Sequence, residues 1–170
     1  EMLSRNARMY GSQIALVERE PEKNRRVEIT WTQFDNQANQ LAGVLLSKGI
    51  KKGDRVVQLM TNCIEWLPIY FGILRTGAWA VPLNFRFDSK TIYHCTEIAA
   101  AKVLIFGEEF IERINSIKTD LDQTVETYIF VGPEETRPVY AESYHKLSAA
   151  QNPVDPKIEI NVLDDAALYF

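Results

Sequence analysis

The sequence lacks a glycine-rich phosphate loop, although it has eight glycines in 170 residues. The glycines are scattered, and none forms the G-x-G-x-x-G or G-x-x-x-x-G-K-[ST] pattern in which backbone amides cradle phosphates. A G-x-S-x-G nucleophile elbow is also missing, so no serine is marked as a nucleophile. The residues by themselves therefore indicate a domain without a self-contained catalytic site.

Cysteine and histidine are also scarce. Cys63 and Cys95 are too few for a disulfide framework and do not have metal-ligand spacing. His94 and His145 stand in no recognisable catalytic context, and we interpret both as structural or surface residues. The adjacent carboxylates of Asp164–Asp165 point to opposite faces of an expected strand, which excludes a shared proton or metal. The pattern favours a reduced, cytoplasmic protein.

The chain has neither an excess of basic residues nor a long apolar run. Its 19 lysines and arginines are outnumbered by 23 acidic residues, which gives a net charge of −4. This balance argues against nucleic-acid binding and against docking on anionic membranes. The longest apolar stretch, Trp66–Leu74, is about half of the ~20 residues that a transmembrane helix needs. The N-terminus does not have the layout of a secretory signal.

Strand-like and helix-like segments alternate over most of the chain. Strands are expected to start near residues 55, 78, 102 and 127, at offsets of 23, 24 and 25 residues. This spacing holds a strand, a helix and two short loops, and it predicts βαβ units with a parallel sheet. Right-handed crossovers then place helices on both faces. The predicted fold class is α/β, with a three-layer, doubly wound, mainly parallel, Rossmann-like sheet.

Local signals predict where further elements begin and end. Two short strands, Ile14–Glu18 and Val27–Thr30, flank a polar turn and predict a short N-terminal hairpin. Thr32 and Asn62 each have the spacing of a helix N-cap. A last short helix is expected over Tyr140–Leu147.

The two parts of the chain differ in pattern. Residues 1–150 carry the strand–helix alternation, whereas residues 151–170 contain a proline-rich linker and end in the strand-compatible segment Ala167–Phe170. The chain stops inside that segment and starts at Glu1 rather than at a methionine. We interpret it as a piece of a larger protein.

Three segments resemble a known family. The first surrounds the start of a predicted helix, the second is the turn before the first parallel strand, and the third leads through the next strand. They are Ile29–Phe34 (ITWTQF) with Asn36, Asn39, Leu41 and Ala42, then Gly49–Val56 (GIKKGDRV) with Asn62 and Glu65, and finally Ile73–Asn84 (ILRTGAWAVPLN). In this order they resemble the N-terminal part of an acyl-CoA synthetase of the AMP-dependent synthetase and ligase (adenylate-forming) family. The resemblance covers essentially the whole chain.

The resemblance implies an activity for the intact enzyme. Such an enzyme joins a carboxylic acid to ATP, giving an acyl-adenylate and pyrophosphate, and then transfers the acyl group to CoA, with magnesium on the ATP phosphates. Residues 1–150 are then its N-terminal α/β subdomain, and 151–170 the linker and the start of the strand that leads to a phosphate loop beyond Phe170. The fragment itself is expected to be inactive and to hold no cofactor, and its exposed domain interface is expected to allow homo-oligomer formation. Amino-acid-adenylating and luciferase-like members of the family share this N-terminal part, so these residues do not distinguish a CoA ligase from another adenylate-forming enzyme. They also do not specify which carboxylic acid, fatty, aryl or other, is activated.

Arg86 is the residue for which the resemblance implies a role in ligand binding. It follows the predicted strand Ala78–Leu83 and precedes a helix, at the edge where open α/β sheets bind ligands and where helix amides favour anions. Some acyl-CoA synthetases have an arginine here, in a P-L-N-x-R stretch, and use it on the phosphates of CoA. The other interpretation is an exposed scaffold arginine that pairs with Asp88 or Glu97. No catalytic residue and no metal ligand is assigned.

A second class of function stays open at this point. A non-catalytic, flavodoxin-like α/β regulatory or ligand-binding module has the same alternation of strands and helices. It also lacks catalytic residues, so their absence does not separate the two interpretations. The three resembling segments favour the synthetase.

Overall fold

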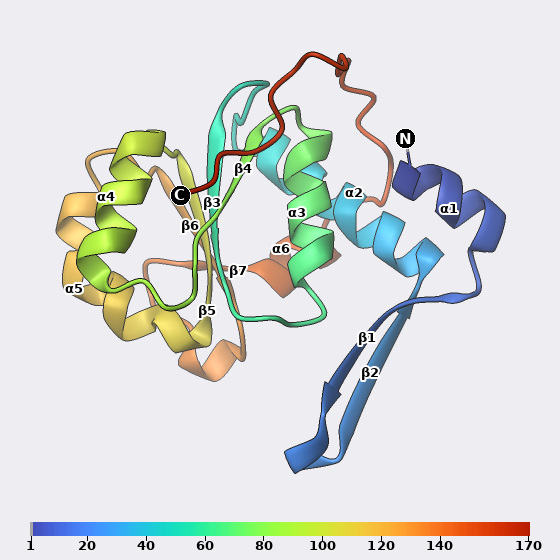
Figure 1. Cartoon of the computed structure of the whole chain (residues 1–170), viewed down its shortest axis with the longest axis horizontal. Coiled ribbons are helices and arrows are strands. Elements are labelled where there is room, and N and C mark those ends of the chain that lie inside the picture. The colour runs from blue at the N-terminus through green and yellow to red at the C-terminus, as the bar shows by residue number, and fades with distance from the viewer. Residues whose placement is uncertain (1) are drawn as a thin grey trace.

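The computed structural model describes residues 2–170. Its centre is a five-stranded parallel sheet in the order β4-β3-β5-β6-β7 (Figure 1). The strand order reverses once, between β3 and β5, so the sheet is doubly wound. The strands are β3 Arg55–Leu59, β4 Trp79–Pro82, β5 Val103–Gly107, β6 Thr127–Val131 and β7 Glu142–Ser143.

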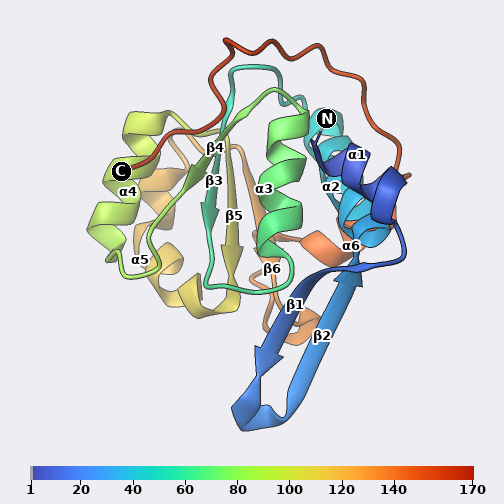
Figure 2. The same cartoon turned by 45° about the vertical axis from the view of Figure 1, so that its right-hand side comes forward.

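Helices cover both faces of this sheet, as Figures 1 and 2 show. One face is covered by α2 Trp31–Ser47, α3 Trp66–Arg75 and α6 Tyr144–Ala149. The other face is covered by α4 Ser89–Ala99 and α5 Ile111–Leu121, with the 3-10 turn η2 Glu108–Phe110 before α5. The predicted three-layer α/β fold is confirmed.

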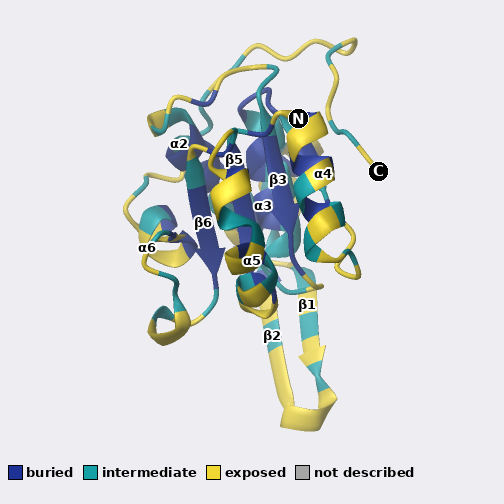
Figure 3. Cartoon of the chain, turned by 90° about the vertical axis from the view of Figure 1, so that its left-hand side faces the viewer, coloured by how far each residue is buried: buried dark blue, intermediate teal, exposed yellow. Residues whose placement is uncertain are grey.

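Alternate residues of each central strand belong to two separate cores. In β5, Leu104 and Phe106 pack with α4 and α5, whereas Val103 and Ile105 pack with α2 and α3. All four side chains are fully buried, and Figure 3 shows the central strands as the buried part of the molecule. A strand that is buried on both faces has a continuous apolar sequence, which is why these strands could be located from the sequence.

An antiparallel hairpin projects from this body (Figures 1 and 2). It is formed by β1 Ile14–Glu20 and β2 Arg25–Thr30, joined through the 3-10 turn η1 Pro21–Lys23. Asn24 closes this turn in the left-handed conformation, with a φ of 48°. The helix α1 Met2–Tyr10 packs at the base of the hairpin, where Leu3 is buried against Phe34 of α2. The predicted hairpin is confirmed.

Two helix starts differ from the prediction. The N-cap of α2 is Thr30 and not Thr32, because the Thr30 hydroxyl accepts from the Gln33 amide at 3.2 Å and the Gln33 side chain accepts from the Thr30 amide at 2.8 Å. This reciprocal pair is a capping box. α3 begins only at Trp66, so Asn62 does not cap it.

The region of the predicted helix Tyr140–Leu147 also differs. It contains the two-residue strand β7, and α6 begins after it. The reason is Ser143, whose hydroxyl accepts from the Lys146 amide and caps α6 at that point. A further 3-10 turn, η3 Glu134–Thr136, lies between β6 and β7.

The predicted strand Ala167–Phe170 is reduced to a single parallel bridge between Ala167 and Ala80 of β4. The Ala80 amide donates to the Ala166 carbonyl at 3.0 Å, and the Leu168 amide donates to the Ala80 carbonyl at 2.9 Å. Residues 151–165 contain no helix or strand and lead to this contact along the outside of the molecule (Figure 1). Among residues 2–170, no helix is both long enough and apolar enough to cross a membrane.

Candidate functional site

The carboxyl ends of the parallel strands meet at one edge of the sheet, which we call the carboxyl edge. The strand order reverses here between β3 and β5, and the crevice outside such a reversal is where open α/β sheets bind ligands. A hollow of about 640 Å³ lies at this point. Its walls are the segments that follow β3, β5 and β6, the start of α6, and the hairpin. The geometry therefore gives one candidate site before any chemistry is considered.

Carboxylates dominate this hollow. Six glutamates line it, against Arg25, Lys146 and one histidine. Glu109 bridges the ends of β3 and β5, because its Oε1 accepts from the Thr61 amide at 2.8 Å and from the Thr61 hydroxyl at 2.6 Å. The acidic lining repels a free anion and favours a neutral or cationic group.

The charged groups after β6 are held in ion pairs. Glu134 accepts from Lys146 Nζ at 3.0 Å and from Arg137 Nε at 2.9 Å. These hydrogen bonds hold the pKa of Glu134 below its usual value, and the bond from Lys146 has a larger effect than the bond from Arg137. His145 lies 3.9 Å from Glu65 and is half-exposed on α6, which agrees with its interpretation as a surface residue.

Cys63 lines the same hollow, and its thiol is protonated at neutral pH. Burial, reinforced by the neighbouring Glu65 carboxylate, raises the pKa of Cys63 to about 12. Cys95 is buried against the core on the α4 side. In the part of the chain that the structure describes, no three His, Cys, Asp or Glu side chains are grouped to hold a metal ion.

Arg86 lies in the loop between β4 and α4, also at the carboxyl edge. The Arg86 amide donates to Asn84 Oδ1 at 2.9 Å, which folds the loop into a turn. Asp88 then caps α4 by accepting from the Thr91 amide at 2.8 Å. Hydrogen bonds from the Thr91 side chain and amide lower the pKa of Asp88.

Arg113 of α5 fixes the same loop from the neighbouring helix. It donates to the carbonyl of Phe85 at 2.7 Å and to that of Phe87 at 3.0 Å. The exposed Arg86 guanidinium lies over the Phe85 ring, 5.3 Å from the ring centroid. The backbone of the loop is thus held on both sides, while the tip of Arg86 faces solvent.

The ion pair with Asp88 or Glu97 that is predicted for a scaffold role of Arg86 is not formed. Within residues 2–170, Arg86 forms no ion pair with Asp88 or Glu97, and each of these carboxylates accepts a hydrogen bond from another group. Asp88 is the cap of α4, and Glu97 accepts from the Tyr93 hydroxyl at 2.8 Å.

Arg86 does not belong to the hollow at the strand reversal, since none of the lining residues comes from its loop. The structure therefore places two separate features on the carboxyl edge, an acidic hollow and a fixed loop with an exposed arginine. Sequence reasoning missed the hollow. The only available signal for it was the pair of carboxylates Glu108–Glu109 directly after the apolar strand β5.

Comparison with known proteins decides between the two function classes. Residues 3–169 match a family described as AMP-binding enzyme. The chain belongs to this family. The strand order of this AMP-binding family member is also the flavodoxin order, so the sheet topology alone does not separate the alternatives. The family match favours the synthetase and not the flavodoxin-like module.

Two relatives illustrate the similarity to known sequences. This AMP-binding family member is 35% identical over 101 residues to the long-chain-fatty-acid–CoA ligase FadD13 of Mycobacterium tuberculosis, a match that covers 59% of this chain and 20% of the relative. It is 34% identical over 95 residues to the 3-hydroxybenzoate–CoA/4-hydroxybenzoate–CoA ligase of Thauera aromatica, covering 56% of this chain and 18% of the relative. The matched part is thus about a fifth of each relative.

Two solved structures have the same fold as this chain. A fatty acyl CoA synthetase of Mycobacterium tuberculosis superposes with a TM-score of 0.84 at 28% identity, over 99% of this chain and 31% of that chain. The N-terminal domain of FACL13 from the same organism superposes with a TM-score of 0.83 at 28% identity, over 98% of this chain and 39% of that domain. The predicted resemblance to the N-terminal part of an adenylate-forming enzyme is confirmed.

Proposed function

We propose that the chain is the N-terminal α/β part of an acid–CoA ligase. The intact enzyme joins a carboxylate to ATP, giving an acyl-adenylate and pyrophosphate, and CoA then displaces AMP to give the acyl-CoA. The observation that carries the proposal is the family match over residues 3–169, together with relatives whose names are CoA ligases. The doubly wound sheet with its reversal between β3 and β5 supports it, because this topology presents loops to a ligand at one edge.

We also propose a fatty or an aryl acid as the substrate. One matched relative is named for long-chain fatty acids and another for hydroxybenzoates. The test is a panel of palmitate, decanoate, benzoate and 4-hydroxybenzoate with the full-length enzyme, measured by CoA consumption. If none of these four acids is turned over, the proposed substrate class is contradicted. The ligase reaction itself is then tested by the same assay with other carboxylic acids.

No magnesium ligand is assigned among these residues. Magnesium usually keeps several waters and is held by one or two carboxylates together with the phosphates of the substrate. Within residues 2–170 no three His, Cys, Asp or Glu side chains are grouped to hold a metal ion. No step of the proposed reaction is therefore placed on a metal held by this part of the enzyme.

Arg86 is proposed to bind a phosphate group of CoA. Its backbone is fixed by Asn84 and by Arg113 through the neighbouring carbonyls, and the Phe85 ring supports its guanidinium. The planar guanidinium can bind a phosphate through two hydrogen bonds. The 11-residue helix α4 begins at Ser89, three residues after Arg86, and its N-terminus is capped by the Asp88 carboxylate, so the guanidinium carries the attraction for an anion.

The substitution Arg86→Ala in the full-length enzyme tests this role. We expect the KM for CoA to rise about 10-fold or more, because a hydrogen bond to a charged group contributes about 1.5–3 kcal/mol. Adenylate formation, measured as carboxylate-dependent ATP–pyrophosphate exchange, should stay unchanged. The matched control is Lys90→Ala, which removes an exposed cation from the same region. An unchanged KM for CoA, or an equal loss in the exchange reaction, would show that Arg86 is part of the scaffold only.

The 170-residue chain alone is expected to form no acyl-adenylate. Transfer of the adenylyl group from ATP to the carboxylate, with pyrophosphate leaving, needs hydrogen-bond donors and cations placed around the phosphates. The sequence contains no glycine-rich loop whose amides could supply such donors. The measurement is carboxylate-dependent ATP–pyrophosphate exchange with the purified chain, compared with the full-length enzyme. Exchange above the enzyme-free background would contradict this prediction and place catalytic groups inside these residues.

A further inference from the structure

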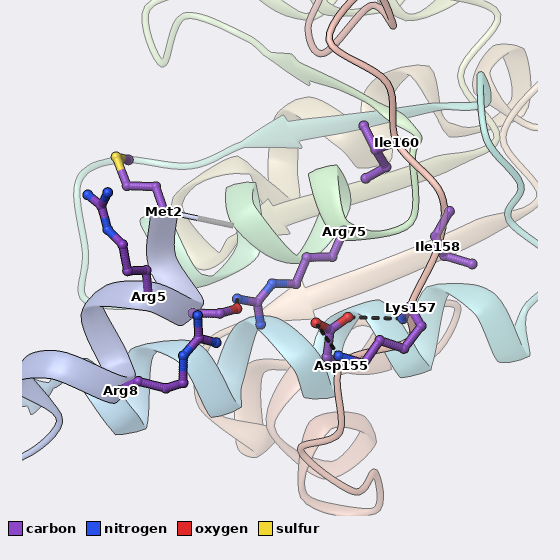
Figure 4. A pocket seen from close by; sticks show the side chains of 9 residues that line it. Met2, Arg5, Arg8, Arg75, Asp155, Lys157, Ile158 and Ile160 are labelled. Atoms are coloured by element: carbon purple, nitrogen blue, oxygen red, sulfur yellow. Dashed lines mark hydrogen bonds and ion pairs between the residues drawn. The ribbon is translucent and has the colours of Figure 1, made fainter.

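A basic hollow lies away from the carboxyl edge, beside the last residue of α3. It is formed by α1, by Arg75 at the end of α3, and by residues 155–160, and its volume is about 970 Å³ (Figure 4). A second hollow of about 370 Å³ shares Ser4, Arg8, Asp155 and Lys157 with it. These volumes are those of small-molecule sites, which span about 300–1,000 Å³.

The charge of this hollow is opposite to that of the whole chain. Four cations line it, Arg5, Arg8, Arg75 and Lys157, and Asp155 is its one carboxylate within residues 2–170. The chain as a whole has a net charge of −4. A concave surface lined by one sign of charge concentrates counter-ions, so this hollow attracts anions that the rest of the surface repels.

Arg75 is the fixed wall of the hollow. It pairs with the Asp35 carboxylate at 2.5 Å and donates to the Asp35 carbonyl and the Ser4 hydroxyl, each at 2.9 Å. It also donates to Asn39 Oδ1. The Arg75 side chain is only 13% exposed. Its charge is therefore balanced by Asp35, and its role is to hold α1, α2 and α3 together beneath the hollow.

Of the other three cations, Arg8 and Lys157 face the hollow, whereas the Arg5 side chain extends toward Met2 and away from Arg75 (Figure 4). Among the described residues Arg8 has no ion-pair partner, and Figure 4 shows its guanidinium pointing into the hollow, toward Arg75. Lys157 Nζ lies 3.5 Å from the Asp155 carboxylate with its side chain 82% exposed, which is a weak contact.

The backbone at Lys157 is held in an uncommon conformation. Its φ is 57°, in the left-handed region that favours glycine, and its amide donates to Asp155 Oδ1 at 2.9 Å. This turn brings residues 155–160 against α1 and Arg75, so that cations from two distant parts of the sequence face one hollow.

We propose that this hollow binds a small anion with linked phosphates, with Arg8 and Lys157 as its ligands. Arginine binds phosphate through its planar fork and lysine as a point charge, so two cations on facing walls suit a di- or polyphosphate. Met2, Ile158 and Ile160 at the rim can contact an organic portion of the ligand. The acidic remainder of the surface disfavours an extended anionic partner. The proposal does not depend on the ligase function or on Arg86.

The test is a titration of the chain with inorganic tripolyphosphate. Binding is measured by isothermal titration calorimetry and by changes in the NMR chemical shifts of the backbone amides. We expect saturable binding, with shifts in α1 and residues 155–160. Arg8→Glu and Lys157→Glu should each weaken binding at least about 10-fold, as expected for loss of a charge-assisted hydrogen bond. The matched control is Arg19→Glu, which changes the net charge equally at an exposed position of the hairpin and should leave the affinity within about twofold.

Three further arms make the result decisive. ADP in place of tripolyphosphate distinguishes a nucleotide from an inorganic polyphosphate, and shifts in the same residues support the proposal in either case. Equal weakening by Arg19→Glu, or binding that does not saturate, would overturn it as non-specific attraction. Hexaglutamate binding as tightly as tripolyphosphate would overturn it in favour of an acidic peptide. Arg8→Gln, checked by circular dichroism, replaces Arg8→Glu if the charge reversal disturbs folding.

Discussion

At the scale of single residues, Thr30 decides where α2 begins. Thr30 and Thr32 both have capping spacing, and the structure selects Thr30 because β2 ends there and Gln33 completes the reciprocal pair. Sequence spacing alone does not separate two candidates two residues apart. The choice depends on where the preceding strand stops pairing with β1.

Thr30→Ala is expected to lower the free energy of unfolding by about 1 kcal/mol, because it removes the acceptor for the Gln33 amide. Thr32→Ala is the control, since Thr32 is exposed and is not the cap, and it should change stability by less than about 0.5 kcal/mol. Urea unfolding of the two variants measures both values. A larger loss for Thr32→Ala would show that the helix begins at the later threonine.

The position of Arg86 could be predicted from the sequence, but its surroundings could not. The segments on either side of Arg86 identify it as following β4 and preceding α4, which fixes the edge of the sheet where it lies. The contacts of Arg113 with the Phe85 and Phe87 carbonyls join two different helix–loop units. Such a contact depends on how α5 packs beside α4, which no local pattern encodes.

At the scale of elements, α2 and α3 approach closely at Gly72. A Cβ atom at this position would lie 2.8 Å from Leu41 Cβ and 3.0 Å from the Ala38 carbonyl oxygen. Both neighbours are fully buried parts of α2, so they have little room to move. The absence of a side chain at Gly72 therefore sets the distance between the two helices.

Gly72→Ala is expected to destabilise the chain by about 1–3 kcal/mol through overpacking. Gly43→Ala is the matched control within α2, where the new Cβ meets the end of the Gln151 side chain at 3.1 Å and that flexible group can move. Its helix-propensity gain of up to about 1 kcal/mol should leave Gly43→Ala neutral or more stable. Thermal unfolding of both variants is the measurement, and equal effects would contradict the close approach.

The elements differ in how well the sequence predicts them. The four strands β3, β4, β5 and β6 could be located because each is largely buried and apolar. β7 has two residues and exists only through its pairing with β6 at Ile129 and Phe130. Its sequence carries no strand pattern, so local signals predict a helix there.

At the scale of the whole molecule, several carboxylates share one direction of pKa shift. For Asp54, burial acts to raise the pKa, but the ion pair with Lys102 at 2.9 Å and the Lys51 amide at 2.8 Å prevail and lower it. The same net lowering applies to Glu20, Asp88, Asp122, Glu134, Asp155 and Asp164. The unfolded chain therefore takes up protons at a higher pH than the folded chain does.

These shifts predict loss of stability in acid. The contribution of each carboxylate is fully present above its unfolded pKa of 3.8 or 4.5 and is lost as the pH falls through the lower folded value. At the alkaline end, burial raises the pKa of Cys63 and Tyr140 to about 12, so their contribution is lost as the pH rises above the unfolded values of 9.0 and 10.0. The melting temperature should therefore be highest between about pH 5 and 8. Circular dichroism melting curves recorded from about pH 3 to 11 test this prediction. A melting temperature that stays constant when the pH is lowered below about 4 would contradict it.

The contact between Ala80 and the end of the chain also bears on aggregation. Ala80 uses both its amide and its carbonyl on residues 166 and 168, so part of the outer side of β4 is covered. At the opposite side of the sheet, β7 has only two residues. An exposed strand with free amides and carbonyls is a template on which another chain can add a strand, the first step toward fibrils. A segment without regular secondary structure thus occupies, at Ala80, edge groups of β4 that an added strand would use.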